Sequence, residues 1–142
     1  MNLILIVSIL SSLYTTPTNE GEFILYVEGI KEIRGNIGIL VFDKNTGFPE
    51  KAENAVFELE VKVTAKEMKL NLGKLPFGEY AIALVHDINA NKTLDKNMLG
   101  IPKEPFGFSN NRSIFWGLPD FEDAAVSFHS ELKETTIKLI EL

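Results

Sequence analysis

The sequence contains no cysteine, one tryptophan and two histidines among its 142 residues. Without cysteine the chain has no disulfide, no thiolate metal ligand and no cysteine nucleophile. The two histidines, His86 and His129, do not form a zinc-binding pattern. No convincing helical periodicity appears, and no run beyond residue 20 is long and apolar enough to span a bilayer. These absences exclude a disulfide-stapled scaffold and a thiolate or zinc centre.

Positive charge is also scarce. The chain has 14 basic and 20 acidic residues, a net charge of −6, and an isoelectric point near 5.0. Nucleic acids and anionic membranes attract proteins with basic patches, so we expect neither as a partner. An acidic balance is compatible with cation binding, and it is equally ordinary for a soluble protein.

The first residues differ from the rest of the chain. Met1–Tyr14 is an apolar run, shorter than the ~20 residues that a membrane-spanning helix needs. Its length is typical of the apolar region of a secretory signal, although no A-x-A cleavage site follows. We predict a signal peptide over residues 1–20, cleaved between Ser11 and Glu20, and a single exported domain over 21–142. That domain would be periplasmic, cell-surface or secreted, with no membrane span after processing. The alternative is a first β-strand or a buried N-terminal segment.

Strand patterns recur along the remaining chain, separated by turn residues. Phe57–Val63 alternates apolar and charged residues, as a strand with one buried face does. Ile37–Phe42 is an almost continuous apolar run, which predicts a strand buried on both faces. The other expected strands are Glu22–Glu28, Lys69–Leu72, Tyr80–His86, Ala124–His129 and Glu134–Ile140. About seven strands without intervening helices predict an antiparallel β-sandwich of the immunoglobulin-like or prealbumin-like kind.

One long segment, Asp87–Pro119, shows no regular pattern. Loops longer than ~12–15 residues in compact domains are usually functional or disordered. This one is rich in aromatic residues, which predicts an ordered, packed loop. Phe106, Phe108 and Trp116 form a candidate ligand surface for a carbohydrate or a peptide. The alternative is that these rings pin the loop to the sandwich.

Oxygen-bearing side chains alternate at the start of this segment. They are Asp87, Asn89, Asn91, Thr93 and Asp95. The spacing matches the first nine positions of an EF-hand-like calcium loop, with the Thr93 backbone carbonyl at position 7. Lys92 replaces the glycine of position 6, and Met98 replaces the glutamate of position 12. Further ligands would come from Asn97, Glu104, Asp120 or Asp123. The alternative is a loop that holds itself together through side-chain-to-backbone hydrogen bonds, without metal.

No catalytic constellation emerges. Ser109 lacks a G-x-S-x-G context, and adjacent strand residues such as His86 and Asp87 point to opposite faces. We therefore expect a non-enzymatic exported binding or structural module with a calcium-binding loop, and a protein or glycan as partner. The alternatives are a carbohydrate- or peptide-binding module, or a hydrolase, that uses the aromatic-rich loop 104–121.

A long motif in this segment resembles that of a known family. It runs His86-Asp87-x-Asn89-x-Asn91-x-x-Leu94-Asp95-x-Asn97-x-x-Gly100-x-Pro102-x-Glu104, followed by Gly107-Phe108-Ser109-Asn110-Asn111. Together with Phe48-Pro49, Leu75-Pro76-x-Gly78-x-Tyr80 and Pro119-x-Phe121-x-Asp123-Ala124, it is similar to the bacterial DUF2141 proteins over roughly residues 22–142. The resemblance implies a small exported protein of unassigned function with a signal peptide, and it supplies no catalytic residue. Lys92 departs from the glycine expected in the family's loop. The Leu-Pro-x-Gly-x-Tyr turn is also similar to prealbumin-like sandwiches.

Overall fold

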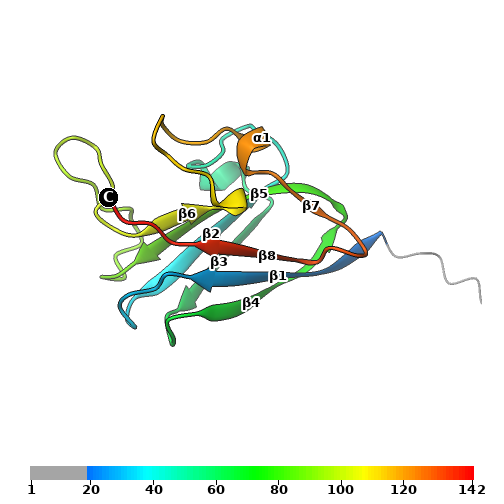
Figure 1. Ribbon diagram of the computed structural model, residues 1–142, viewed down its shortest axis with the longest axis horizontal. Coiled ribbons are helices and arrows are strands. Elements are labelled where there is room, and N and C mark those ends of the chain that lie inside the picture. The colour runs from blue at the N-terminus through cyan, green and yellow to red at the C-terminus, as the bar shows by residue number, and fades with distance from the viewer. Residues whose placement is uncertain (1–18) are drawn as a thin grey trace, which may run out of the picture.

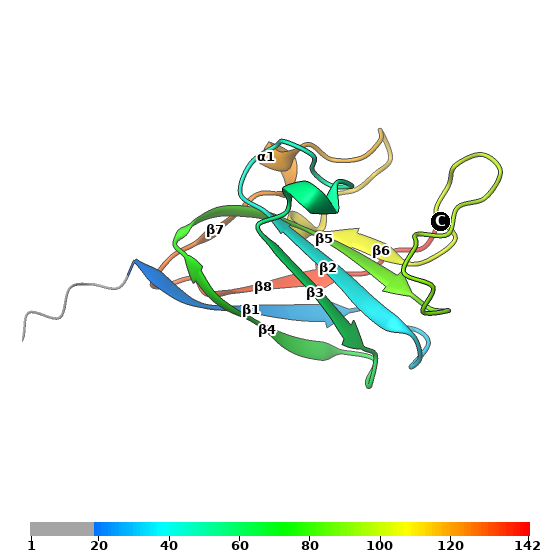
Figure 2. The same cartoon turned by 180° about the vertical axis from the view of Figure 1, so that it is seen from behind.

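A computed structural model of the chain describes residues 19–142. The predicted signal segment lies almost wholly outside these residues, so it stays a prediction. The described chain forms two β-sheets packed face to face (Figures 1 and 2). One sheet has three strands in the order β4-β1-β8, and the other has the order β3-β2-β5-β6, with β7 pairing to β5. The β-sandwich prediction is confirmed.

Eight strands and three short helical turns make up the described chain. The strands are β1 (Glu20–Glu28), β2 (Asn36–Phe42), β3 (Phe57–Lys62), β4 (Met68–Pro76), β5 (Gly78–Asp87), β6 (Phe106–Phe108), β7 (Val126–Phe128) and β8 (Glu134–Lys138). The turns are η1 (Ala52–Asn54), η2 (Ser109–Asn111) and α1 (Phe121–Ala124). Each of the seven expected strands overlaps an observed one, and β6 is the strand that the sequence pattern did not reveal.

The main core lies between the two sheets. It follows from the two-residue alternation of strands, which sends every second side chain to the same face. Ile37, Ile39 and Val41 of β2 are 0–1% exposed and pack against the equally buried Leu25 and Val27 of β1. Burying aliphatic side chains of this size stabilises the fold by roughly 1.5–3 kcal/mol each.

A second, smaller core covers part of the opposite face of the five-stranded sheet. Ala81 and Ala83 of β5 pack there with Phe106, Phe108 and Ala124. The Phe48 ring adds edge contacts to Phe42, Phe108 and Phe121, with ring centroids 5.3, 6.1 and 6.3 Å apart. This explains the nearly continuous apolar sequence of β2 and β5, because both faces of these strands meet apolar groups.

Two features of the strand pairing differ from a sandwich of two separate, purely antiparallel sheets. Strand β8 pairs with β1 in parallel. Beyond β8, Ile140 exchanges backbone hydrogen bonds with Phe106 of β6, at 3.0 and 2.8 Å, so the C-terminal segment links the two sheets along one side. Among the described residues, no helix has the length and apolar character needed to cross a membrane.

Candidate functional site

The outer face of the five-stranded sheet is hollowed beside the second core. Its floor consists of small and aliphatic residues of β2 and β5, namely Gly38, Leu40, Ala83 and Val85. These residues alternate with the core-facing side chains, so they must point away from the sandwich interior. A solvent-facing sheet normally carries polar residues there, as Glu58 and Glu60 of β3 do.

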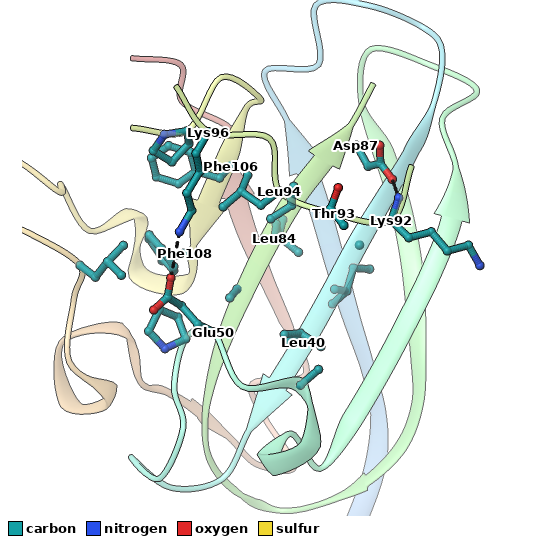
Figure 3. Close-up of a pocket in the computed structure, with 18 of the residues that line it drawn as sticks. Leu40, Glu50, Leu84, Asp87, Lys92, Thr93, Leu94, Lys96, Phe106 and Phe108 are labelled. Atoms are coloured by element: carbon teal, nitrogen blue, oxygen red, sulfur yellow. Dashed lines mark hydrogen bonds and ion pairs between the residues drawn. The ribbon is translucent and has the colours of Figure 1, made fainter. Parts of the chain in front are cut away.

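Loops wall this groove on several sides. Segment 92–102 stands on one side, the turn at Pro49 and Glu50 on another, and Ile114 with Leu118 on a third. The space is about 780 Å³, within the ~300–1,000 Å³ range of small-ligand pockets. Figure 3 shows Lys96 reaching from the loop to Glu50, with 3.4 Å between Nζ and Oε1. This ion pair is exposed and therefore contributes little energy.

The three predicted ligand-surface aromatics divide into two groups. Phe106 and Phe108 line the groove but are only 3% and 5% exposed, so they belong to its packed floor. Trp116 is 94% exposed and stands outside the groove, at the tip of a turn with Phe115. The structure therefore does not gather the three rings into one stacking platform.

Asp87 begins the predicted cation loop at the end of β5. Its side chain is buried, with 6% of the residue exposed. Oδ1 accepts the Asn91 N–H at 3.1 Å, and Oδ2 accepts the Lys92 N–H at 2.6 Å. The loop turns sharply around this carboxylate, with Ala90 at φ 56° and Lys92 at φ 65°. Lysine thus takes the left-handed conformation that glycine would adopt without steric cost.

The middle of the loop is held by its own amides. Asn89 Oδ1 accepts the Asn91 N–H at 3.0 Å, and Asn91 Oδ1 accepts the Thr93 N–H at 2.8 Å. The amide nitrogens of Asn89 and Asn91 both donate to the Asp95 carboxylate, at 2.7 and 3.1 Å. Each asparagine therefore uses both ends of its amide, which fixes its orientation. This is the self-bonded arrangement that the sequence left as the alternative to a metal.

Glu104 has a structural role that the sequence did not predict. On the sequence alone it was only a possible metal ligand. It is 5% exposed, and its two oxygens accept the N–H groups of Ile88 at 3.0 Å and Asp95 at 3.2 Å. The carboxylate thereby joins the end of β5 to the start of segment 95–103. Because it bridges residues far apart in sequence, no local pattern could have indicated this role.

Among the remaining candidate ligands, the side chains of Asn97 and Asp123 have other partners than these carboxylates. Asn97 Oδ1 accepts the N–H groups of Leu99 and Ile101, at 2.9 and 3.0 Å. Asp120 and Asp123 belong to the start of α1, where Asp123 pairs with Arg112 at 3.1 Å. Within residues 19–142 the structure places no group of three or more His, Asp or Glu side chains so that they could hold a metal ion. An ion in the loop would therefore need amide and backbone oxygens as well.

Two side chains considered for catalysis, those of His86 and Ser109, make hydrogen-bond contacts to the backbone. His86 is fully buried and its Nε2 lies 2.8 Å from the Arg34 carbonyl oxygen, while Nδ1 has no partner among the described atoms. Ser109 Oγ accepts the Ile82 N–H at 2.8 Å and donates to the Ala124 carbonyl. Both contacts tie loops to strands.

Tyr80 stabilises the Leu75–Tyr80 turn, one of the motifs that resemble those of the DUF2141 proteins. Its hydroxyl donates to the Pro76 carbonyl at 2.7 Å, closing the turn that leads into β5. Burial raises the pKa of this phenol above its ordinary value of 10.0, and the negative charge of Asp43 adds to the effect. The neutral phenol is the form that can donate this hydrogen bond.

Together, the fold and site define a small β-sandwich with a carboxylate-centred loop beside an apolar groove. The chain matches the family model described as "Uncharacterized protein conserved in bacteria (DUF2141)" over residues 25–138. The protein therefore belongs to the DUF2141 family. The searches returned no match among curated proteins and none among solved structures.

Proposed function

We propose that this protein is a non-enzymatic binding module, and that its ligand site is the groove on the outer face of the five-stranded sheet. The observation that carries the proposal is the apolar floor of this groove at strand positions that face outward. Pockets with an apolar floor and a few polar groups at the rim are typical ligand sites. Here the rim carries charges of both signs, including Glu50, Lys92 and Lys96.

An apolar segment of a peptide fits this groove better than a sugar does. Sugar-binding modules stack the ring on an exposed aromatic face, and the two rings that line this groove are buried. Aliphatic groups such as Leu40 and Val85 instead suit an apolar side chain. The charged rim would then contact the polar backbone and flanking residues of the peptide.

Gly38 offers a direct test because it lies in the groove floor. A Cβ added there would meet only the Val85 carbonyl oxygen, at 4.0 Å. The Gly38→Gln variant should therefore fold normally and place its side chain in the groove. The matched control is Gly78→Gln, at another strand position where the nearest atom to a new Cβ is 3.9 Å away and which does not line the groove.

The assay selects binders from a random peptide library displayed on phage, and then measures the affinity of the enriched peptide by calorimetry. We expect enriched sequences to share an apolar anchor. Gly38→Gln should weaken binding by about tenfold or more, a change of ~1.4 kcal/mol, while Gly78→Gln should leave it unchanged. Equal affinity in both variants, or enrichment of no peptide, would contradict the proposal.

For the loop, we propose calcium as a weakly bound ligand. Three carboxylates, those of Asp87, Asp95 and Glu104, share one hydrogen-bond network, and no ion pair in residues 19–142 involves any of them. This uncompensated negative charge favours a hard cation. With amide ligands in the set, we expect dissociation constants on the order of 10⁻⁴–10⁻³ M.

Thermal unfolding in calcium and in EDTA tests this second proposal. Calcium at 100 times its dissociation constant would add about 2.7 kcal/mol to the free energy of unfolding. Asp95→Asn should abolish that gain. A midpoint that does not change between EDTA and tens of millimolar calcium would show that the internal hydrogen bonds alone hold the loop.

We further propose that the protein is exported, as its N-terminal sequence predicts. In the part of the chain that the structure describes, the first strand is β1, which starts at Glu20, so cleavage before that residue would leave all eight described strands intact. Expression in a bacterial host followed by intact-mass measurement of the extracytoplasmic fraction tests this proposal. Recovery only of the full-length chain from the cytoplasm would contradict it.

A further inference from the structure

Strand β3 forms one margin of the five-stranded sheet. Within residues 19–142 it pairs with β2 alone, in an unbroken register from Asn36↔Lys62 to Val41↔Phe57. The other margin of this sheet, at β6, is bonded to the C-terminal segment through Ile140. Figure 2 shows β3 at the margin of its sheet, with β2 along one side of it. Among the described residues, the backbone on its other side therefore has no partner strand.

Alternate residues of β3 turn their backbone groups toward this free side. In an antiparallel pair, residues alternate between bonding to the neighbouring strand and pointing away from it. Just beyond the strand, the Val63 N–H donates to the Gly35 carbonyl at 3.0 Å, so Val63 belongs to the set that bonds to β2. By this alternation, the residues whose N–H and C=O groups point outward are Glu58, Glu60 and Lys62.

The other strand edges carry features that hinder the addition of a strand. The Asn111 side chain covers the edge of β8 that faces away from β1, because its Nδ2 donates to the Thr136 carbonyl at 3.1 Å and its Oδ1 accepts the Lys138 N–H at 2.8 Å. Strands β6 and β7 are three residues long, and β4 shifts register against β1 near Gly73, whose φ is 81°. Short strands, bulges and covered edges prevent edge-to-edge association. In contrast, β3 runs for six residues without proline, glycine or a register shift.

The charges along β3 match a reversed copy of the same strand. Glu58, Glu60 and Lys62 are exposed, and no ion pair within residues 19–142 involves them. In an antiparallel pair of two copies centred on Glu60, Glu58 of each copy faces Lys62 of the other. Leu59 of each copy likewise faces Val61, on the core side. This register pairs five of the six residues of β3, and unlike charges that face each other directly stabilise such a pair.

At the centre of this register, two Glu60 side chains lie opposite each other. Asn36 Nδ2 donates to Glu60 Oε1 at 3.0 Å, and Asn36 belongs to β2, on the side of β3 away from the free edge. The hydrogen bond therefore draws each Glu60 carboxylate away from the centre of the contact. The repulsion that remains weakens the pairing but leaves both Glu58–Lys62 pairs intact.

We propose that β3 is a self-association edge, at which two copies of the chain pair their β3 strands antiparallel and join their five-stranded sheets into one. The contact is isologous, so both copies supply the same residues. The charges of β3 select this partner, because an apolar strand at the same edge would face Glu58, Glu60 and Lys62 without a counter-charge. Both grooves then open on the same face of the joined sheet. The contact uses the sheet edge and not the groove floor, so the proposal is independent of the peptide proposal.

Sedimentation equilibrium of the whole chain, over a series of concentrations, measures the association. We expect a monomer–dimer equilibrium with a dissociation constant in the micromolar range, because a contact between two strand edges is small for a protein interface. Lys62→Glu replaces two attractive pairs by two repulsive ones and should weaken the dimer about tenfold or more. The matched control is Lys133→Glu, the same change of charge at an exposed position in the turn before β8, which should leave the association unchanged.

The deciding variant exchanges the two charges. Glu58→Lys with Lys62→Glu should restore the dissociation constant to within about twofold of the parent, because each lysine again faces a glutamate. A structural defect caused by Lys62→Glu alone would persist in this variant. Glu60→Gln should strengthen the dimer about twofold or more, because it removes the like charges at the centre.

Amide hydrogen exchange reports on the backbone pairing itself. The protection of the Glu58, Glu60 and Lys62 amides should rise with protein concentration, whereas the amides of β4 should not change. Circular dichroism of each variant checks that these exposed substitutions leave the fold intact. All variants keep the same N-terminal segment, so any association through that segment is constant among them.

Five results would overturn the proposal. The first is a chain that stays monomeric at millimolar concentration, and the second is an equal loss of association in Lys62→Glu and Lys133→Glu. The third is a charge-exchange variant that associates as weakly as Lys62→Glu. The fourth is a weaker dimer in Glu60→Gln, which would place Glu60 rather than Glu58 opposite Lys62. The fifth is amide protection that does not depend on concentration, which would show that another segment of the same chain covers the edge.

Discussion

Replacing Glu104 by glutamine changes one atom at the junction that organises the candidate site. The carboxylate is buried and accepts two backbone N–H groups, those of Ile88 and Asp95, one on each oxygen. Glutamine has the same shape but one acceptor oxygen, and its amide nitrogen would face the other N–H. One hydrogen bond to a charged acceptor is lost, and a donor is left without a partner.

The expected loss of stability follows from the one hydrogen bond that the variant loses. A hydrogen bond to a charged group contributes about 1.5–3 kcal/mol. For a domain of this size, each kcal/mol shifts the unfolding midpoint by about 4 °C. Glu104→Gln should therefore lower the midpoint by roughly 6–12 °C in EDTA. Glu58→Gln on the exposed face of β3 is the control and should stay within about 0.5 kcal/mol of the parent.

Two measurements check this reasoning together. Calorimetry gives the midpoint, and amide hydrogen exchange reports the protection of Ile88 and Asp95 individually. A midpoint within about 2 °C of the parent would refute the structural role assigned to Glu104. A deficit that appears in calcium but is absent in EDTA would also refute it, because the carboxylate would then act through the ion.

Three further predictions concern single positions. Lys92→Gly should raise the free energy of unfolding by about 0.5–1 kcal/mol, because glycine tolerates the left-handed φ and keeps the N–H group that donates to Asp87. Urea unfolding measures this change, and a loss of stability would contradict the idea that the backbone of Lys92 is strained. Tyr80→Phe should cost about 1 kcal/mol for the lost bond to Pro76. Folding raises the pKa of Tyr80, so the neutral phenol contributes its full stabilisation below pH 10.0, and this contribution declines as the pH rises through the raised pKa. Above pH 10.0 the free energy of unfolding of the parent should therefore fall more steeply with pH than that of the variant. Parallel pH profiles of the two proteins would disprove the assignment. Gly35→Ala should destabilise by roughly 3 kcal/mol or more, because φ is 70° and the new Cβ would lie 2.1 Å from the Asp87 carbonyl oxygen; normal expression and an unchanged midpoint would contradict that contact.

Much of the sandwich could be read from local pattern. The alternation of Phe57–Val63 and the apolar run of Ile37–Phe42 correspond to β3 and β2 within one residue at either end. These patterns are strong because each face of a strand lies against either the core or the solvent. The residues of that face are accordingly apolar or polar, which gives the alternation in the sequence. The long motif from His86 onward likewise sufficed to indicate the family.

Other features depended on contacts between residues distant in sequence. Strand β6 is three residues long and exists because β5 and Ile140 pair with it. The parallel pairing of β8 with β1 leaves no trace in the alternation, which is the same for either direction.

The sequence by itself determined the class of fold, the family and the position of an oxygen-rich loop, because these follow from residue type and spacing. Only the tertiary structure decided which aromatic rings are buried and which are displayed. Phe106 and Trp116 lie in the same patternless segment, yet one is 3% exposed and the other 94%. Without periodicity, burial depends on what the folded chain brings alongside each ring, and that information is not local.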